Sequence, residues 1–211
     1  MLITRSVHIT TGKIVCDDKT VFEALEPLPF TEFIKSAFKS LDTAYPKFYK
    51  MDKLSKLAFV ASEILLKDKE IPQRYKPETI GLIFQNANST IETDIEHQLT
   101  IADRKNYFPG PAIFVYTLPN IMLGEICIRN KFQGENALFI FDTFKPEHLF
   151  AHVSLLFQKN KIDVCIAGWA DIVGENYESF MMLIEPESML ANSKDFTTFD
   201  SSNLNILFSK K

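Results

Sequence analysis

Residues 108–136 read FPGPAIFVYTLPNIMLGEICIRNKFQGEN, and residues 136–144 continue the chain as NALFIFDTF. A helix is predicted to begin close to Pro119, because proline is tolerated in the first turn of a helix. The apolar residues after this helix predict a buried strand at 137–141, and Pro146 predicts the start of the next helix. The stretch therefore predicts a turn from strand to helix, which we call the elbow, between that strand and Pro146.

Helices and strands are predicted to alternate along the rest of the chain. Strands are expected at 2–10, 79–84, 163–168 and 179–185, with a short one near 204–208, and helices at 31–40, 51–66, 89–101, 120–130 and 146–160. Apolar residues recur every 3.6 positions in 51–66, which predicts a one-faced helix. The unbroken apolar run at 79–84 is typical of a parallel strand covered on both faces. The pattern predicts one layered α/β/α domain over residues 1–211 with a mixed, mostly parallel sheet.

Composition argues against several classes of function. The 211 residues carry 27 acidic and 23 basic side chains, a net charge of −4, with no basic run for binding nucleic acid. No apolar run approaches the ~20 residues of a membrane span, and the N-terminus does not resemble a signal peptide. The three cysteines are widely spaced, which argues against disulfides or structural zinc and favours a reducing cytoplasm.

The skeleton T-L-P-N-x-x-x-G-x-x-x-I-R followed by G-x-N resembles the N-terminal half of β-ketoacyl-acyl-carrier-protein synthases, the ketosynthases of the thiolase-like family. Further pieces of the family pattern occur in the same order. They are M-D-x-x-x-x-x-A at 51–58, the strand at 79–84, T-x-E at 90–92, D-x-x-I-A-G at 163–168 and the strand that ends in E-P at 180–186. The resemblance is strongest over residues 45–190. The family's glycine-rich beginning is reduced here to TGKIV at 11–15.

The residue at the nucleophile position departs from the family. In ketosynthases the strand after G-x-N leads to the catalytic cysteine, and here that place falls on Thr143. Cys127 and Cys165 are too far along the chain for a shift of register to bring either one to the elbow. An alcohol is far harder to deprotonate than a thiol, and no base is identifiable beside Thr143. The family's two catalytic histidines lie in a second half that this sequence does not contain.

The resemblance implies an accessory subunit like a chain length factor, catalytically inactive and without a cofactor. Its expected partners are a full-length ketosynthase or a second copy, and an acyl carrier protein, in fatty-acid-like, aryl-polyene or polyketide synthesis. The elbow and acyl-pocket candidates are Phe141, Asp142, Thr143, Phe144 and His148, and the interface candidates are Thr117, Pro119, Asn120 and Trp169. Two alternatives stay open: an active synthase or acyltransferase with another nucleophile, and a stand-alone module that binds acyl carriers.

Other residues have simpler interpretations. His148 and His152 are spaced i, i+4, as metal ligands on a helix can be, but no partner ligand stands at zinc-site spacing. A Thr143–His148–Asp142 arrangement for acyl transfer does not follow from this spacing. We interpret Cys127 and Cys165 as small core residues. A lone thiolase-like half would leave an apolar face exposed, which favours a dimer.

Overall fold

One sheet runs through the structure, a computed structural model that describes residues 1–105, 107–190 and 195–210. Its strands are β1 (Leu2–Thr10), β2 (Lys13–Cys16), β3 (Lys19–Glu23), β4 (Ile80–Asn86), β5 (Asn136–Ile140), β6 (Val164–Val173), β7 (Asn176–Glu185) and β8 (Thr197–Thr198). The strand order is β3-β2-β1-β7-β6-β4-β5, and β8 pairs with β1. The first and last described segments therefore join one sheet.

The sheet is mixed, as predicted, but the expectation of a mostly parallel sheet is wrong. Only β4 runs parallel to its neighbours β5 and β6, whereas the other described pairs are antiparallel. The reason lies in the connections. Tight turns join β1 to β2, β2 to β3 and β6 to β7, and such turns produce antiparallel pairs, whereas helical crossovers flank β5. The β2–β3 hairpin was not predicted, because its residues show little apolar alternation.

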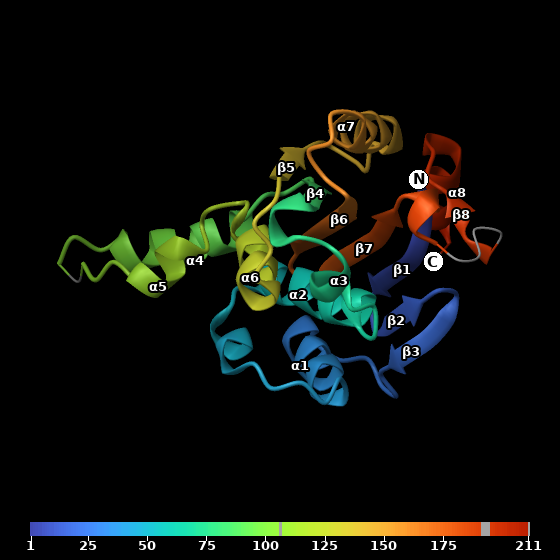
Figure 1. The fold of residues 1–211 in the computed structure, drawn as a ribbon. Helices are drawn as coiled ribbons and strands as arrows, with labels where there is room; N and C mark the ends of the chain where they lie inside the picture. The colour runs from blue at the N-terminus through green and yellow to red at the C-terminus, as the bar shows by residue number, and fades with distance from the viewer. Residues whose placement is uncertain (106, 191–194, 211) are drawn as a thin grey trace.

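Helices cover both faces of this sheet. They are α1 (Phe30–Ser40), α2 (Lys53–Leu66), α3 (Ile71–Arg74), α4 (Ile91–Ile101), α5 (Pro111–Val115), α6 (Ile121–Asn130), α7 (Pro146–Gln158) and α8 (Ser201–Ser209), with short 3-10 helices η1 (Pro46–Lys50), η2 (Pro77–Thr79) and η3 (Glu187–Met189). In Figure 1, α1, α2 and α6 lie on one side of the sheet and α7 and α8 on the other. The layered α/β/α arrangement is therefore confirmed.

Two apolar cores lie on opposite faces of the sheet, and β4 contributes to both. Leu82 and Phe84 belong to the core beneath α1, α2 and α6, while Ile83 belongs to the core beneath α7 and α8. Every residue of β4 is buried, as its unbroken apolar sequence predicted. Helix α2 is buried on more than the single face that its spacing predicted, because it lies between the sheet and the helices α1 and α6.

Two expectations about exposed elements are corrected. The strand predicted at 137–141 forms β5, but it lies at the edge of the sheet and is not buried. Among the described residues, β5 pairs with β4 on one side and has no neighbouring strand on the other. The segment near 204–208 forms α8 and not a strand, because Asp200 caps a helix by accepting a hydrogen bond from the backbone N–H of Asn203.

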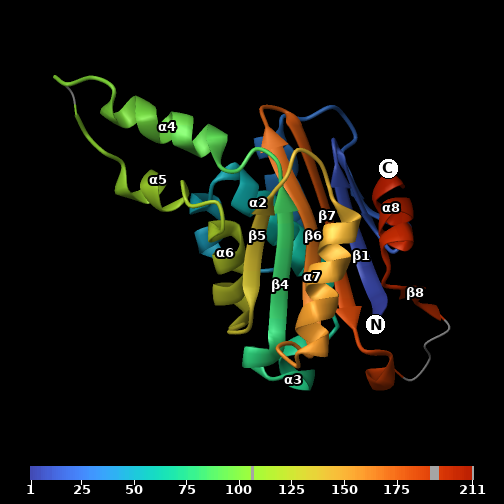
Figure 2. The same cartoon turned by 90° about the horizontal axis from the view of Figure 1, so that it is seen from above.

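Helices α4 and α5 form an arm, residues 91–105 and 107–118, that projects away from the sheet (Figure 2). Its two helices meet through the rings of His97 and Phe114, whose centroids are 5.4 Å apart. The backbone N–H of Phe108 also donates a hydrogen bond to the carbonyl oxygen of Thr100. The arm is therefore a helical hairpin outside the main core.

Among the described residues, no helix combines the length and the apolar character needed to cross a membrane.

Candidate functional site

The elbow lies where the carboxyl ends of the parallel strands β4, β5 and β6 meet. Side chains of β4 and β6 form hydrogen bonds that link these ends. The Asn86 side chain donates from Nδ2 to the carbonyl oxygen of Ala170 at 2.7 Å. The backbone carbonyl oxygen of Asn86 accepts a hydrogen bond from the N–H of Phe141 at 2.9 Å. The carboxylate of Asp171 accepts the backbone N–H groups of Ala87 at 3.1 Å and Asn88 at 2.9 Å. Asp171 is thus a structural acceptor that fixes the loop after β4. It lies within strand β6 and not in a loop, which the residues around Gly174 had suggested.

Gln85 fixes the other end of the elbow. Its buried side chain donates from Nε2 to the carbonyl oxygen of Lys145 at 3.0 Å and accepts the Lys145 N–H at Oε1 at 2.8 Å. A buried amide that uses its donor and its acceptor on one residue holds that backbone in a single orientation. The start of α7 is therefore held in place from the neighbouring strand.

Thr143 is exposed at the elbow. Its hydroxyl takes part in none of the hydrogen bonds within the described part of the chain. Asp142 is exposed and forms an ion pair with Lys145 at 2.7 Å, and this hydrogen-bonded cation lowers the pKa of the Asp142 carboxyl. His148 faces Gln85 instead, with 3.4 Å between its Nδ1 and the Gln85 Nε2. The arrangement Thr143–His148–Asp142 is therefore not assembled.

An outer aromatic cluster lies between the edge strand β5 and α7. The ring of His148 lies 4.5 Å from that of Phe139 and 4.7 Å from that of Phe141, both in edge-on geometry. His152 stacks parallel to His148 at 6.2 Å and also meets Phe139. Burial, and then the neighbouring His148, lower the pKa of His152. No group of three metal-ligating side chains occurs among the residues described.

An inner aromatic cluster surrounds Phe144, the residue that follows Thr143 in the elbow. Phe144 is buried and lies 6.4 Å from Trp169 and 5.9 Å from Phe180, in edge-on geometry with both. Trp169 had been a candidate for a partner surface, but only 6% of it is exposed. Its ring fills space beneath α8, so its proposed place on a partner surface is not supported. The elbow thus separates its two phenylalanines, Phe141 toward the outer cluster and Phe144 toward the inner one.

The remaining interface candidates lie where the arm joins the core. Thr117 and Pro119 are half-exposed and Asn120 is exposed. The carbonyl oxygen of Thr117 accepts a hydrogen bond from the Thr90 hydroxyl at 3.0 Å, which ties the two ends of the arm together. These three residues therefore lie at the base of the arm and remain candidates for an interface.

Sequence reasoning missed the apolar surface of the arm. Its exposed large apolar side chains are Ile91, Ile95, Leu99, Tyr107, Phe108, Phe114, Val115 and Leu118. Three of them follow the i, i+4, i+8 spacing of a helix face, which normally indicates a face directed toward the core. The spacing was visible in the sequence, but only the projection of the arm shows that this face of α4 is not covered in this chain.

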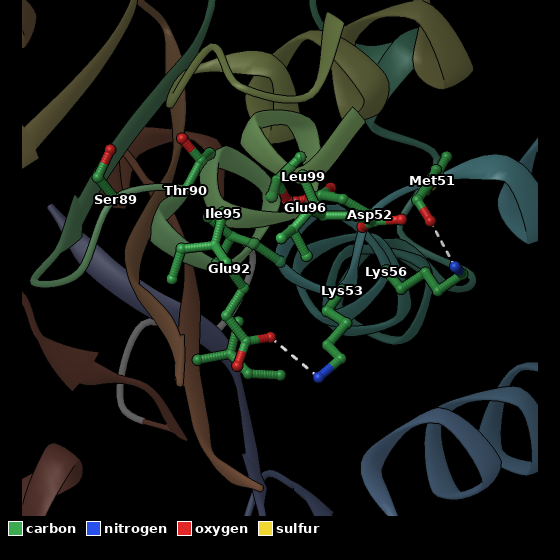
Figure 3. A pocket seen from close by; sticks show the side chains of 13 residues that line it. Met51, Asp52, Lys53, Lys56, Ser89, Thr90, Glu92, Ile95, Glu96 and Leu99 are labelled. Carbon is green, nitrogen blue, oxygen red and sulfur yellow. Dashed lines mark hydrogen bonds and ion pairs between the residues drawn. The ribbon is translucent and has the colours of Figure 1, made fainter. Parts of the chain in front are cut away.

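A cleft of about 550 Å³ separates α4 from the beginning of α2 (Figure 3). Asp52 caps α2 by accepting the backbone N–H of Ser55 at 3.0 Å, and it also accepts the hydroxyl of Thr93 at 3.2 Å. Burial raises the pKa of Asp52, although these hydrogen bonds and Lys56 act in the opposite direction. Lys53 crosses the cleft to form an ion pair with Glu92 at 2.9 Å. The cleft thus combines an apolar wall with charged groups.

The cysteines lie outside the elbow. Cys165 is fully buried, and burial raises its pKa strongly. Burial also raises the pKa of Cys127, on α6, to about 11. Both thiols therefore stay protonated near neutral pH, which agrees with their interpretation as core residues.

No model of a protein family matches the chain, and its sequence matches no curated protein. Solved structures do match its fold. The ishigamide ketosynthase/chain length factor superimposes with a TM-score of 0.67 at 13% identity, over 90% of this chain and 63% of that chain. The complex AntDE:AntF, a type II PKS acyl-carrier protein with its ketosynthase bound to the hexaketide, gives 0.60 at 15% identity, over 92% of this chain and 65% of that chain.

A third structure is the ketosynthase ApeO in complex with its chain length factor ApeC from Xenorhabdus doucetiae. It superimposes with a TM-score of 0.55 at 14% identity, over 88% of this chain and 79% of that chain. The chain spans about two thirds or less of the first two structures. At these identities the likeness establishes the fold alone. The chain has the thiolase-like α/β fold found in ketosynthases and chain length factors.

Proposed function

We propose that the chain is an accessory subunit of the chain-length-factor kind, a single domain that pairs with a ketosynthase in fatty-acid-like, aryl-polyene or polyketide synthesis. The observation that carries the proposal is the state of the elbow. Gln85 and Asn86 hold its backbone, but the exposed Thr143 carries no thiol, and its hydroxyl forms no hydrogen bond with any base among the described residues. A frame that is kept while its nucleophile is lost supports a structural role beside a reactive partner.

We assign the partner face to β5 and the arm. The strand β5 has a free edge among the described residues, and an edge strand offers unpaired backbone groups to a second sheet. The arm adds exposed apolar side chains, of which Leu99 is 72% exposed and Phe108 75% exposed. Exposed apolar side chains gathered on one element in this way are typical of a protein interface. Thr117, Pro119 and Asn120, at the base of the arm, belong to the same face.

We place the contact with an acyl carrier protein beside the cleft at the beginning of α2. Lys47, Lys50, Lys53 and Lys56 follow one another here in a chain of net negative charge. Lys47 and Lys53 are engaged with Glu125 and Glu92, whereas Lys50 is exposed. Lys56 donates to the carbonyl oxygen of Met51, so the exposed Lys50 is the cation that this face offers to a partner with an acidic surface. Lys50→Glu should weaken carrier binding by about tenfold, and Lys19→Glu on the far edge strand β3 should leave it unchanged.

The pairing is tested by native mass spectrometry of the tagged protein purified from its own cells. The expected result is a one-to-one complex with a full-length ketosynthase. Leu99→Glu should weaken that complex at least about tenfold, because it places a charge in the apolar contact. Ile206→Glu is the matched control, since Ile206 is also exposed and apolar but lies on α8. A chain that stays monomeric, or a complex equally weakened by both variants, contradicts the proposal.

The length of the acyl product gives a second readout. Deletion of the chain should change the product length of the partner ketosynthase, whereas loss of the partner should abolish product altogether. We also propose a cytoplasmic location, because the cysteines of the described residues are all free, as is usual in a reducing compartment.

A further inference from the structure

Four aromatic side chains form a cage on the face of the sheet beneath α8. They are His8 from β1, Trp169 from β6, Phe180 from β7 and Phe144 from the elbow, and all four are buried. Phe180 connects the group, because its ring lies 5.5 Å from that of His8 and 5.9 Å from that of Phe144. Phe144 directly follows Thr143, so the cage lies immediately behind the elbow.

The occupant of this cage is Phe208, near the end of α8. Its ring stacks on that of Phe144 at 4.6 Å with 29° between the planes. It meets Phe180 edge-on at 5.7 Å and Trp169 edge-on at 6.5 Å, and it stacks against His8 at 6.1 Å. Stacked and edge-on partners around one ring are the arrangement that aromatic groups prefer. The cage therefore suits an aromatic ring, and a side chain of the same chain supplies it.

Helix α8 is tied to the sheet at both of its ends, and Leu204 in its middle is buried in the core. Before it, the two residues of β8 pair with β1, and the N–H of Phe199 donates to the carbonyl oxygen of Met1. After it, His8 approaches the carbonyl oxygen of Lys210 with Nδ1 at 3.0 Å, and Lys210 forms an ion pair with Asp18. Between the ends, α8 packs on α7. Such an element opens at lower free energy than the central strands β6 and β7.

The length of α8 supports the same conclusion. The helix spans nine residues and exposes Ile206 on its outer side. A helix this short is not stable in water by itself, so its order depends on Leu204 and Phe208 remaining seated. Withdrawal of Phe208 would uncover the cage without breaking any pairing among β1, β6 and β7.

We propose that the aromatic cage is a binding site for an aryl group, closed in this structure by Phe208, and that α8 is the strap that opens it. The ligand class follows from the occupant, since the cage accepts a six-membered ring between stacked and edge-on partners. Opening would place such a group against Phe144, directly behind the elbow. This inference does not depend on pairing with a ketosynthase.

Native-state hydrogen exchange on the unaltered protein tests the strap. The amides of α8 are expected to exchange at least about tenfold faster than those of β6 and β7, through an opening that leaves the sheet folded. If α8 exchanges only at the rate of global unfolding, it is a fixed part of the core and the proposal is overturned. This measurement needs no variant and stands even if a substitution prevents folding.

Trp169, the only tryptophan in the sequence, tests the cage directly. In Phe208→Ala, quenching of Trp169 fluorescence by acrylamide should rise about threefold, and benzene at millimolar concentration should reverse the increase and raise the melting temperature. Ile206→Ala, on the outer side of the same helix, should behave as the wild type with and without benzene. Unchanged quenching in Phe208→Ala, or no response of that variant to benzene, overturns the proposal.

Discussion

The side-chain amide of Gln85 holds both backbone groups of Lys145, its Nε2 at 3.0 Å from the carbonyl oxygen and its Oε1 at 2.8 Å from the nitrogen. This pair of bonds crosses from β4 to the residue before α7. It needs no catalytic group, because it acts on the backbone alone. These two bonds do not involve the side chain at position 143, so they hold the backbone of the elbow whichever residue stands there.

Gln85→Ala should lower the free energy of unfolding by about 2 kcal/mol, because it removes two hydrogen bonds and leaves the Lys145 backbone groups without partners. The measurement is urea unfolding followed by circular dichroism. Gln98→Ala is the control, since Gln98 is exposed on α4, and it should change stability by less than about 0.5 kcal/mol. Equal effects of the two substitutions would show that the contact to Lys145 contributes little.

Substitution by alanine should have opposite effects on stability at two glycines. At Gly168 in β6, a Cβ atom would lie 1.9 Å from the carbonyl oxygen of Phe180 on the paired strand, so Gly168→Ala should cost about 3 kcal/mol or more. At Gly124 in α6, the nearest atom to an added Cβ is the Ile121 Cδ1 at 3.8 Å, so Gly124→Ala should stabilise the protein by about 0.8 kcal/mol through helix propensity. Thermal unfolding of both variants, measured side by side, gives the signs.

The cysteines should react in an order set by burial. At pH 8 a thiol with a pKa of about 11, as in Cys127, is thiolate in about one molecule in a thousand, so iodoacetamide should modify it slowly. Half-exposed Cys16 should react sooner, and the fully buried Cys165 only after unfolding. In Thr143→Cys, the exposed new thiol should react before any of these. Timed mass spectrometry gives the order, and early modification of Cys165 would contradict the buried strand.

An acyl-labelling experiment distinguishes the proposed accessory role from catalysis at the elbow. Incubation of the wild-type chain with a labelled acyl thioester should leave no adduct that survives denaturation, because no described side chain is hydrogen-bonded to the Thr143 hydroxyl to act as its base. A stable adduct that disappears in Thr143→Ala would instead establish an active acyltransferase. A stable adduct that disappears in Cys127→Ser would place the nucleophile on α6.

Much of the fold was predictable because its signals are local. The buried run of β4 and the proline at the start of α7 both predicted their elements correctly. Edge position is not a local property, so the apolar β5 was mistaken for a buried strand. The tail 204–208 was mistaken for a strand because the cap at Asp200 went unrecognised. The balance of parallel and antiparallel pairs depends on which strands become neighbours, and periodicity does not encode that.

The site was predictable only in part. The sequence identified the elbow and the absence of a thiol there, since both depend on residue type and order. It could not show that Phe141 and Phe144 point to different clusters, or that Trp169 lies beneath α8. The role of Gln85 gave no signal either, because a polar residue at the end of a strand does not reveal which backbone it will meet. Contacts between distant segments decide these features.

Burial of Asp52 makes stability depend on pH in a defined direction. The pKa of Asp52 lies above the ordinary value of 3.8, so the folded protein binds this proton more tightly than the unfolded chain. The contribution of Asp52 to stability is therefore greatest below pH 3.8 and is lost as the pH rises through the raised pKa. Asp52→Asn keeps an oxygen that can accept the Ser55 N–H but does not titrate. As the pH rises from about 4 to 7, the free energy of unfolding of Asp52→Asn should therefore increase relative to that of the wild type.

Urea unfolding at several pH values measures this difference. Asp200→Asn makes the same exchange at the cap of α8, where Asp200 accepts the N–H of Asn203 as Asp52 accepts that of Ser55. It separates the loss of a carboxylate at a helix cap from the effect of burial beside the α2–α4 cleft. A difference between wild type and Asp52→Asn that stays constant with pH, or that favours the wild type as the pH rises, would mean that water and Lys56 stabilise the ionised carboxylate fully. The charged wall of the cleft would then be better solvated than its burial indicates.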